Sequence, residues 1–269
     1  MLEHIIHSNV MDHLTYYNIL SDSQHGFRAQ RSCETQLVVT IQELAKTQTE
    51  GKQIDAILLD FSKAFDKVAH NRLLLKLDHY RIRGNTLQWI RHFLTDRTQQ
   101  VILEGTHLST CAVDSGVPQG TVLGPLLLLA FINDLPESVT SNARLFADDC
   151  LLYHVVNTDQ LQLQEDLHQL EKWEKTWQMS FNADKCFTLH ISKKRKPTEY
   201  NYLYLLHNQV LEVTKDSKYL GVTISNDLSW ANHISNITAK SNRTIGFLRR
   251  NIYMHVRKKL KKLHTQHYM

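Results

Sequence analysis

The chain has 269 residues, of which 42% are hydrophobic and 22% charged. This balance favours a globular protein with a substantial core and excludes a disordered one. Four cysteines without paired spacing indicate neither a zinc module nor a disulfide framework, so we expect a reducing compartment. Residues 1–10 contain no long apolar core, so we see no secretory signal and expect a location inside the cell, in the nucleus or the cytoplasm.

The first segment with chemical content is an apolar run that ends in an acid. Ala56 to Leu59 precede Asp60 directly, which is the pattern of a strand buried on both faces. An acid at the mouth of such a strand can bind a hard divalent cation such as Mg²⁺, which prefers oxygen ligands. The alternative is that Asp60 caps the segment that follows, since Asp is a favoured N-cap residue.

Two scaffold elements come next. Apolar residues from Leu87 to Leu94 recur at helical spacing, and Asn85 is a candidate cap for that helix. Residues 99–104 and 106–113 predict a hairpin around Gly105.

A loop rich in glycine and proline runs from Ser115 to Pro125 and leads into an apolar run. Such a loop lets another backbone or a ligand come close, and we expect a buried helix that begins near Pro125. The apolar run falls short of the roughly 20 residues of a bilayer span, so no membrane role is expected. The loop could simply join a strand to a core helix, but Gln119 favours a ligand, because an unliganded loop has no evident need for an amide there.

Neighbouring acids stand between short apolar runs at Leu145 to Leu152. The pattern predicts a hairpin whose turn presents Asp148 and Asp149. Side-by-side carboxylates repel each other, so their use would be to bind a divalent cation, with Asp60 on a neighbouring strand as the partner of Asp148. Taken alone, the pair is more often an ordinary turn.

The last elements are a helix and a basic end. Helical spacing from Leu163 to Trp177, after a cap at Thr158, predicts an amphipathic helix whose tryptophans belong to the core. From Lys240 onward there are nine basic residues and no acid, a composition that would bind nucleic-acid phosphates without sequence preference. A solvated tail explains residues 257–262 equally well, and a nuclear-targeting patch is a weaker third interpretation.

In order and spacing, these segments resemble the reverse transcriptases of non-LTR (LINE-type) retrotransposons. Asp60 with Phe65 is similar to motif A of that family, and the two other central segments to its motifs B and C. Flanking segments resemble a fingers motif, motif D and the primer grip of the family. The six matching segments are Ile19 to Arg28 with Arg31-Ser32, Asp60 to Phe65, Ser115 to Gly124, Phe146 to Asp149, Ser180 to Cys186, and Lys218 to Val222.

The resemblance implies roles for the acids. Asp60, Asp148 and Asp149 would be catalytic: Asp60 and Asp148 would bind two Mg²⁺ ions, with Mn²⁺ as an alternative, and Asp149 would be an accessory acid. The backbone carbonyl of Phe61 would lie beside the metals. Adjacent strand residues point to opposite faces, so Asp148 and Asp149 cannot be equivalent ligands.

Other residues would bind nucleotide or nucleic acid by the same resemblance. Phe65 matches the steric gate that favours deoxynucleotides, although a core aromatic ring is the alternative. Gln119 would pack on the nascent base pair, and Lys185 would approach the triphosphate and act as a general acid, unless it is a solvated surface lysine. Contacts to template or primer would come from Arg28, for which a surface ion pair is the alternative, and from Gly120, Leu220 and Gly221.

The implied architecture is α+β, a polymerase right-hand fold with a palm of antiparallel sheet backed by helices. Residues 1–50 would form partial fingers, residues 51–225 the palm with a fingers insertion around 71–113, and residues 226–269 the start of a truncated helical thumb with a basic tail. The implied function is RNA-directed DNA polymerase chemistry with an RNA template, a DNA primer and deoxynucleoside triphosphates. An earlier fingers segment of the family has no match here, so an inactive remnant that at most binds nucleic acid is the alternative.

Overall fold

The computed structural model describes residues 1–156, 161–193 and 203–266, with side chains up to residue 252. It forms two compact units, Met1–Lys215 and Asp216–Met269. Within the described ranges, no helix is both long and apolar enough to cross a bilayer.

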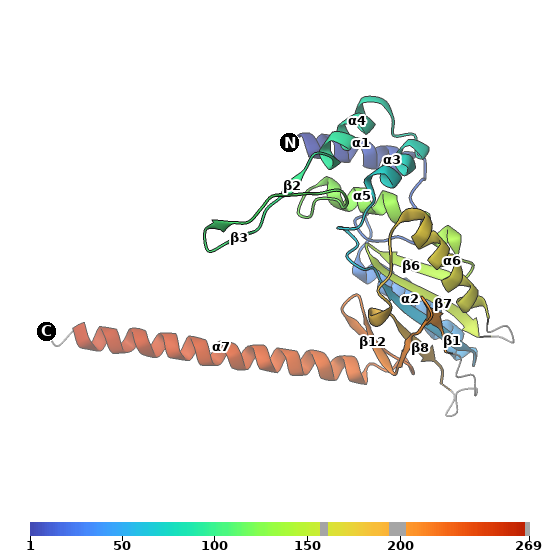
Figure 1. Cartoon of the computed structure of the whole chain (residues 1–269). Helices are drawn as coiled ribbons and strands as arrows, with labels where there is room; N and C mark the ends of the chain where they lie inside the picture. Colours follow the sequence, from blue (N-terminus) through green and yellow to red (C-terminus); the bar gives the residue numbers. More distant parts are fainter. Residues whose placement is uncertain (157–160, 194–202, 267–269) are drawn as a thin grey trace. The chain divides into compact units, whose positions relative to one another are not determined.

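A five-stranded sheet organises the first unit, with the predicted buried strand β1 at its centre (Figure 1). β1 is antiparallel to β7 on one side and to β8 on the other, and β6 closes the edge beyond β7. The sheet is not wholly antiparallel, as had been expected, because the short edge strand β11 pairs parallel with β8. The strands are β1 (Gln53–Asp60), β6 (Asn142–Phe146), β7 (Asp149–Val156), β8 (Phe187–Ile191) and β11 (Glu212–Thr214).

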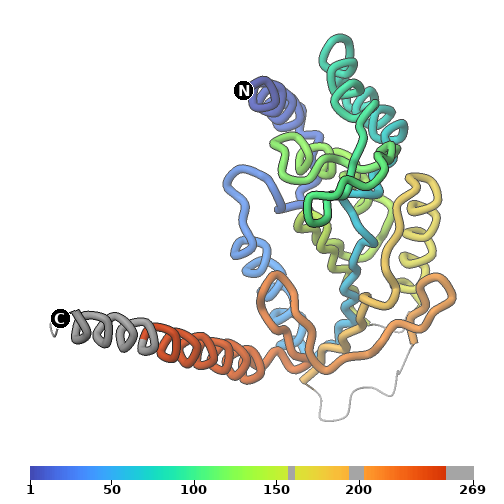
Figure 2. The backbone as a smooth tube through the Cα atoms, turned by 60° about the vertical axis from the view of Figure 1, so that its left-hand side comes forward, coloured from blue at the N-terminus to red at the C-terminus, as the bar shows by residue number. Residues whose placement is uncertain are grey.

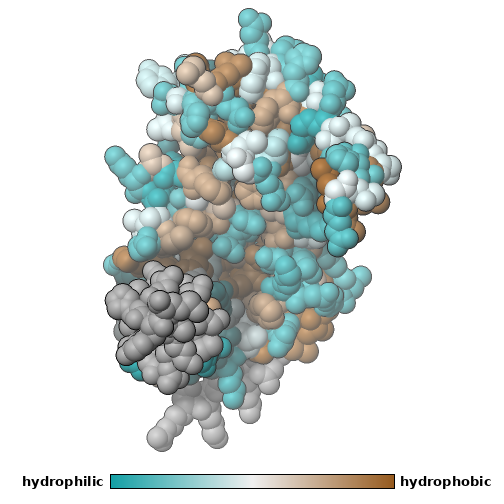
Figure 3. Space-filling model, turned by 90° about the vertical axis from the view of Figure 1, so that its left-hand side faces the viewer, coloured by the Kyte–Doolittle hydropathy of each residue, from teal (hydrophilic) through white to brown (hydrophobic). Residues whose placement is uncertain are grey.

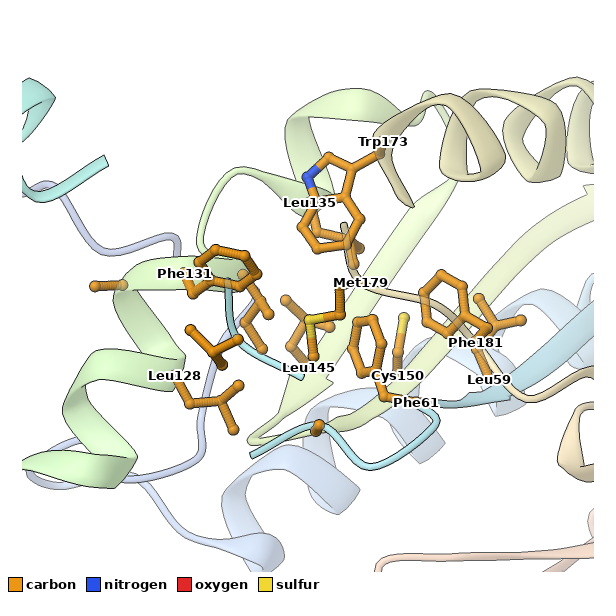
Figure 4. Packing of buried hydrophobic residues seen from close by; sticks show 14 of the residues in the cluster. Leu59, Phe61, Leu128, Phe131, Leu135, Leu145, Cys150, Trp173, Met179 and Phe181 are labelled. Carbon is orange, nitrogen blue, oxygen red and sulfur yellow. The ribbon is translucent and has the colours of Figure 1, made fainter. Parts of the chain in front are cut away.

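Helices cover both faces of this sheet. α6 (Gln162–Trp177) lies across one face and α2 (Cys33–Thr49) across the other (Figures 1 and 4). As predicted, Trp173 is buried and Trp177 packs against the core, while Thr158 lies outside the described residues. In Figure 4, Trp173 descends from α6 toward Leu135 and Met179, so the core is continuous from the sheet to the helices beyond its end.

α5 (Leu123–Ile132) is the buried helix predicted after the loop rich in glycine and proline. It begins two residues before Pro125 and, apart from that proline, is buried along its whole length. α1 (Leu2–Tyr16) and α3 (His70–His79) flank it on either side (Figure 2). The Glu3 carboxylate of α1 accepts the backbone N–H groups of Val122 and Leu123, so it satisfies orphan donors at the start of α5.

The helix predicted around Trp89 is α4 (Gly84–Leu94), but its cap was predicted wrongly. Asn85 lies inside the first turn, and Arg83 occupies the N-cap position without a side-chain hydrogen bond. The helix can begin at Gly84 because glycine adopts that residue's positive φ of +60° without strain.

The predicted hairpin around Gly105 is present and consists of two short ladders. Its strands are β2 (Thr98–Gln99), β3 (Ile102–Leu103), β4 (Thr106–His107) and β5 (Cys111–Ala112). The hairpin extends away from the sheet (Figure 1), and its tip exposes Val101, Ile102 and Leu103. Figure 3 shows scattered brown, hydrophobic patches on a surface that is otherwise mainly hydrophilic. Exposed apolar side chains are common on protein surfaces, and this chain has many.

The remaining short elements of the first unit precede β6 or follow β7 in the chain. They are the 3₁₀ turns η1 (Leu135–Ser138) and η2 (Ala183–Lys185) and the paired strands β9 (Leu205–Leu206) and β10 (Gln209–Val210). The second unit contains a hairpin of β12 (Asp216–Tyr219) and β13 (Val222–Ser225), then the long helix α7 (Ala231–Gln266). His233 on α7 accepts a hydrogen bond from the Thr223 backbone, which ties helix to hairpin.

A buried lysine on α3 contacts both α5 and α6. The Lys76 ammonium on α3 donates to the Phe131 carbonyl and to the Asp134 carboxylate, and it lies 3.7 Å from the ring centroid of Trp177. Trp173 donates to the same carboxylate, at 3.0 Å. Burial lowers the pKa of Lys76 to about 8, although Asp134 opposes the shift.

We predict that Lys76→Met removes a specific pH dependence of stability. Between pH 8 and 10 the native lysine is increasingly neutral whereas the unfolded one stays protonated, so the wild-type free energy of unfolding should rise with pH by up to about 3 kcal/mol relative to the variant. Above pH 10, Tyr80 acts in the opposite direction, because burial raises its pKa to about 12. Urea unfolding at several pH values measures the difference, and parallel curves would contradict the prediction.

Candidate active site

Three carboxylates gather where β1 ends and β7 begins. Asp60 is the last residue of β1, and its cross-strand partner on β7 is Asp149. Asp148 lies in the two-residue turn between β6 and β7, so the expected neighbouring strands are present, with Asp149 and not Asp148 directly across from Asp60. Asp148 is half-buried in the turn and Asp149 is exposed on the strand, so the two acids do not alternate along one strand as had been expected.

These acids share an electrostatic field. Asp149 is exposed to solvent. Its pKa is nevertheless raised, first because the nearby protein removes part of its hydration, and second because Asp148 and Asp60 add negative charge. The Asp60 Oδ2 atom is itself buried and accepts no hydrogen bond from the described residues. The Lys185 ammonium forms an ion pair with that oxygen at 3.4 Å, a contact that the sequence did not reveal. One nearby cation therefore faces three carboxylates.

A segment from Ser180 to Cys186 holds the end of β1 in place. The Phe61 ring stacks on Phe181 with ring centroids 4.3 Å apart, and both rings are buried. Backbone hydrogen bonds of 2.8 Å run from Ser62 N to Ser180 O and from Asn182 N to Asp60 O. This pairing brings η2, and with it Lys185, to Asp60, and it fixes the Phe61 backbone beside the acids.

The loop before α5 packs on the turn that follows β1. Gly116 has φ of +87°, and a Cβ there would come within 2.7 Å of the Asp66 backbone. Phe65 is half-buried, and its carbonyl accepts from Val117 N. The Gln119 amide donates to the Asp66 carboxylate at 3.0 Å, a partner that the sequence did not reveal. Gly120 is exposed with φ of +77° and has open space around it.

A cavity of about 710 Å³ opens beside this loop. Basic, acidic and amide groups line it together, among them Lys63, Arg97, Asp66 and Gln119. Arg97 donates to the Gly116 carbonyl, so the cavity wall and the loop are coupled. A volume of this size lies within the range of small-molecule sites in proteins.

Three further candidate residues belong to other segments, Arg28 in the first unit and Leu220 and Gly221 in the second. The Arg28 guanidinium donates to the carbonyl of Ser21 at 2.7 Å and lies 3.9 Å from the Asp22 carboxylate, so it is engaged within its own loop. Leu220 and Gly221 form the tight turn of the β12–β13 hairpin in the second unit, with φ of +46° and +87°.

The loop from Ile19 to Arg31 contains residues whose role sequence reasoning missed. Gln24 is buried, and both ends of its side-chain amide hydrogen-bond the backbone of Ala147 in the turn that presents Asp148. Gly26 lies so close that an added Cβ would meet Ala147 N at 2.2 Å. Both residues belong to the segment from Ile19 to Arg28 that resembles a fingers motif, but nothing in that segment indicates a contact with Ala147.

Carboxylate oxygens are suitable ligands for a divalent cation, and the Asp60 Oδ2 atom, which accepts no hydrogen bond from the described residues and has only the longer ion pair with Lys185, could serve as one. Within the part of the chain that the structure describes, no three His, Cys, Asp or Glu side chains form a ready-made cage for an ion.

Comparison with known proteins shows the family of the chain. The profile of the family described as "Reverse transcriptase (RNA-dependent DNA polymerase)" matches residues 1–224. The chain is 29% identical over 260 residues to a "Probable RNA-directed DNA polymerase from transposon BS" of Drosophila melanogaster, and 28% identical over 250 residues to an "RNA-directed DNA polymerase from mobile element jockey" of Drosophila funebris. Each match covers 88% of this chain but only 27% of the relative.

Solved structures show the same fold at low sequence identity. Telomerase from Candida tropicalis, in complex with the TWJ fragment of telomeric RNA, superimposes with a TM-score of 0.58 at 12% identity. The match covers 83% of this chain and 36% of the other. The apo telomerase truncated from the C-terminal domain gives 0.55 and covers 84% and 44%.

The family profile covers residues 1–224, so the chain belongs to the reverse transcriptase family. Its named relatives include non-LTR elements of Drosophila, as the sequence motifs predicted. The chain spans about a quarter of the length of these curated relatives.

We predict that Gly26→Ala destabilises the first unit by about 1–3 kcal/mol, because the new methyl group must displace the backbone of Ala147. Gly246→Ala on α7 is the matched control, since a Cβ there meets nothing within 4 Å. Urea unfolding followed by tryptophan fluorescence gives both values. Equal stability of the two variants would show that the loop does not press on the turn.

Proposed function

We propose that this chain is the polymerase core of an RNA-directed DNA polymerase, which adds deoxynucleotides to the 3′-hydroxyl of a DNA primer on an RNA template. The observation that carries the proposal is the β1–β7 register, which sets Asp60 opposite Asp149 with Asp148 in the adjoining turn. Residues 51–225 would be the palm, residues 1–50 and the insertion around 71–113 parts of the fingers, and residues 226–269 the start of the thumb.

Asp60 and Asp148 would hold two Mg²⁺ ions, or Mn²⁺ in their place, with Asp149 and the Phe61 carbonyl beside them. Bound there, the ions would stabilise the attacking and leaving oxygens of an in-line displacement. The raised pKa of Asp149 supports this assignment, because it marks negative charge from Asp148 and Asp60 that the single ion pair with Lys185 does not cancel.

The chain's own groups would orient the substrates. Lys185, 3.4 Å from Asp60, would donate a proton to the leaving pyrophosphate. The Phe65 ring would lie under the sugar, while Gln119, oriented by Asp66, and Gly120 would lie against the nascent base pair. Leu220 and Gly221 would contact the primer. Because one guanidinium nitrogen of Arg28, Nη1, already donates to the Ser21 and Gln24 carbonyls, Arg28 would contact template phosphate through its other N–H groups.

We predict that Asp60→Asn and Asp148→Asn each lower kcat for nucleotide incorporation by about 100- to 1,000-fold, because each removes a carboxylate that would hold the metal ions, and those ions would stabilise the charge of the transition state. Asp149→Asn should cost less. Asp78→Asn is the control and should retain full activity, because Asp78 on α3 is an exposed acid that pairs with Arg83. Primer extension on an RNA template measures all four variants. Activity that survives Asp148→Asn would overturn its assignment, and salt-sensitive RNA binding without any incorporation by the wild type would indicate a binding remnant.

We predict that Phe65→Val reduces the preference for deoxynucleotides over ribonucleotides by about 10- to 100-fold, because the smaller side chain leaves room for a 2′-hydroxyl. The comparison uses kcat/KM for dNTP and rNTP on one primer–template. Phe93→Val on α4, another partly buried ring, controls for lost packing. An unchanged ratio in Phe65→Val would return Phe65 to the role of a core aromatic.

A further inference from the structure

The turn that presents Asp148 has a backbone conformation that needs support. Only its first residue, Ala147, has a positive φ, +53°, the pattern of a type II′ turn, in which that place favours glycine. A non-glycine residue in this region costs about 1–3 kcal/mol. The adjacent like charges of Asp148, Asp149 and Asp60 add repulsion to the strain. The segment therefore has two reasons to relax away from the geometry seen.

Gln24 opposes that relaxation by binding both sides of one residue. Its Oε1 atom accepts from Ala147 N at 2.9 Å, and its Nε2 atom donates to Ala147 O at 3.2 Å. The same Oε1 accepts from Gly26 N at 2.7 Å. With only 2% of its surface exposed, Gln24 has no water to replace these partners, so their loss would leave buried polar groups unpaired.

The clamp is itself fixed to the rest of the fold. The carbonyl of Gln24 accepts from Arg28 at 3.4 Å and from Arg31 at 3.2 Å. On either side of Gln24, backbone bonds of 2.9 Å join Ser23 O and His25 N to Leu145 at the end of β6. Earlier in the same loop, the backbone N–H of Ser21 donates to the side chain of Asn133, which follows α5, at 2.8 Å. Movement of Gln24 is thus restricted from three directions.

We propose that Gln24 is a positioning residue: it holds the Ala147 backbone so that Asp148 and Asp149 keep their carboxylates beside Asp60. This rests on the proposed function, since it concerns the same acids. Gln24 touches no substrate in this role and acts through the turn alone. Arg28 and Arg31 act one step further back, because they hold the backbone of Gln24.

The test compares Gln24→Met with a matched variant in the full chain. Gln164 on α6 is also buried and clamps a backbone residue in the same way, accepting from Leu205 N at 2.8 Å and donating to Leu205 O at 2.9 Å. Gln164→Met therefore removes an equivalent clamp away from the acids. Three readouts are used: amide hydrogen exchange at Ala147, Mn²⁺ binding by electron paramagnetic resonance titration, and kcat for incorporation.

In Gln24→Met alone, Ala147 exchange should become about 3- to 10-fold faster through loss of its hydrogen bond. Mn²⁺ affinity and kcat should both fall by about 10- to 100-fold, as when an outer group that orients a metal ligand is removed. Unchanged exchange would overturn the clamp. Faster exchange with Mn²⁺ affinity and kcat equal to those of Gln164→Met would reduce Gln24 to a structural residue.

The two proposals fail differently. A wild-type chain that binds Mn²⁺ but incorporates no nucleotide would contradict the proposed function alone, and the exchange and Mn²⁺ results would still decide the role of Gln24. A wild-type chain that binds no Mn²⁺ would overturn the positioning role, because the clamp would then have no metal site to organise.

Discussion

The antiparallel register of β1 and β7 places Asp60 opposite Asp149, and like charges in that relation repel each other. Much of the surrounding structure compensates for this one constraint. β1 is buried on both faces at the centre of the sheet, which fixes the register, because a slip of one residue would turn its apolar side chains to the wrong face. Lys185 brings a positive charge to within 3.4 Å of Asp60. The remaining negative charge is available for divalent cations.

Three segments far apart in sequence meet around these acids, each through backbone contacts. Residues 180–186 pair with the end of β1, the loop before α5 packs on Asp66, and the loop of Gln24 holds the turn of Asp148. Glycines at the second and third contacts allow the backbones to approach more closely than a Cβ would permit. Precision at the acids therefore depends on loops that are anchored to a rigid core of α5, α6 and the sheet.

The sequence was sufficient for elements whose signal is local. The apolar run before Asp60, the acid-bearing turn at Asp148 and the apolar helix after Gly124 all formed where periodicity and turn residues predicted them. It was insufficient where the answer depends on pairing over long separations. The partner of Asp60, the parallel edge strand β11 and the contact of Gln24 with Ala147 arise from register and packing, which no single segment encodes. Lys76 was missed for the same reason, because its aromatic and carbonyl partners come from distant helices.

Anomalous diffraction from Mn²⁺, in crystals of the chain with an RNA template, a DNA primer and a non-hydrolysable deoxynucleotide, tests the central claim most directly. The account predicts manganese peaks between the carboxylates of Asp60 and Asp148, with the nucleotide phosphates completing the coordination. Manganese bound elsewhere, or a nucleotide seated away from these two acids, would contradict it.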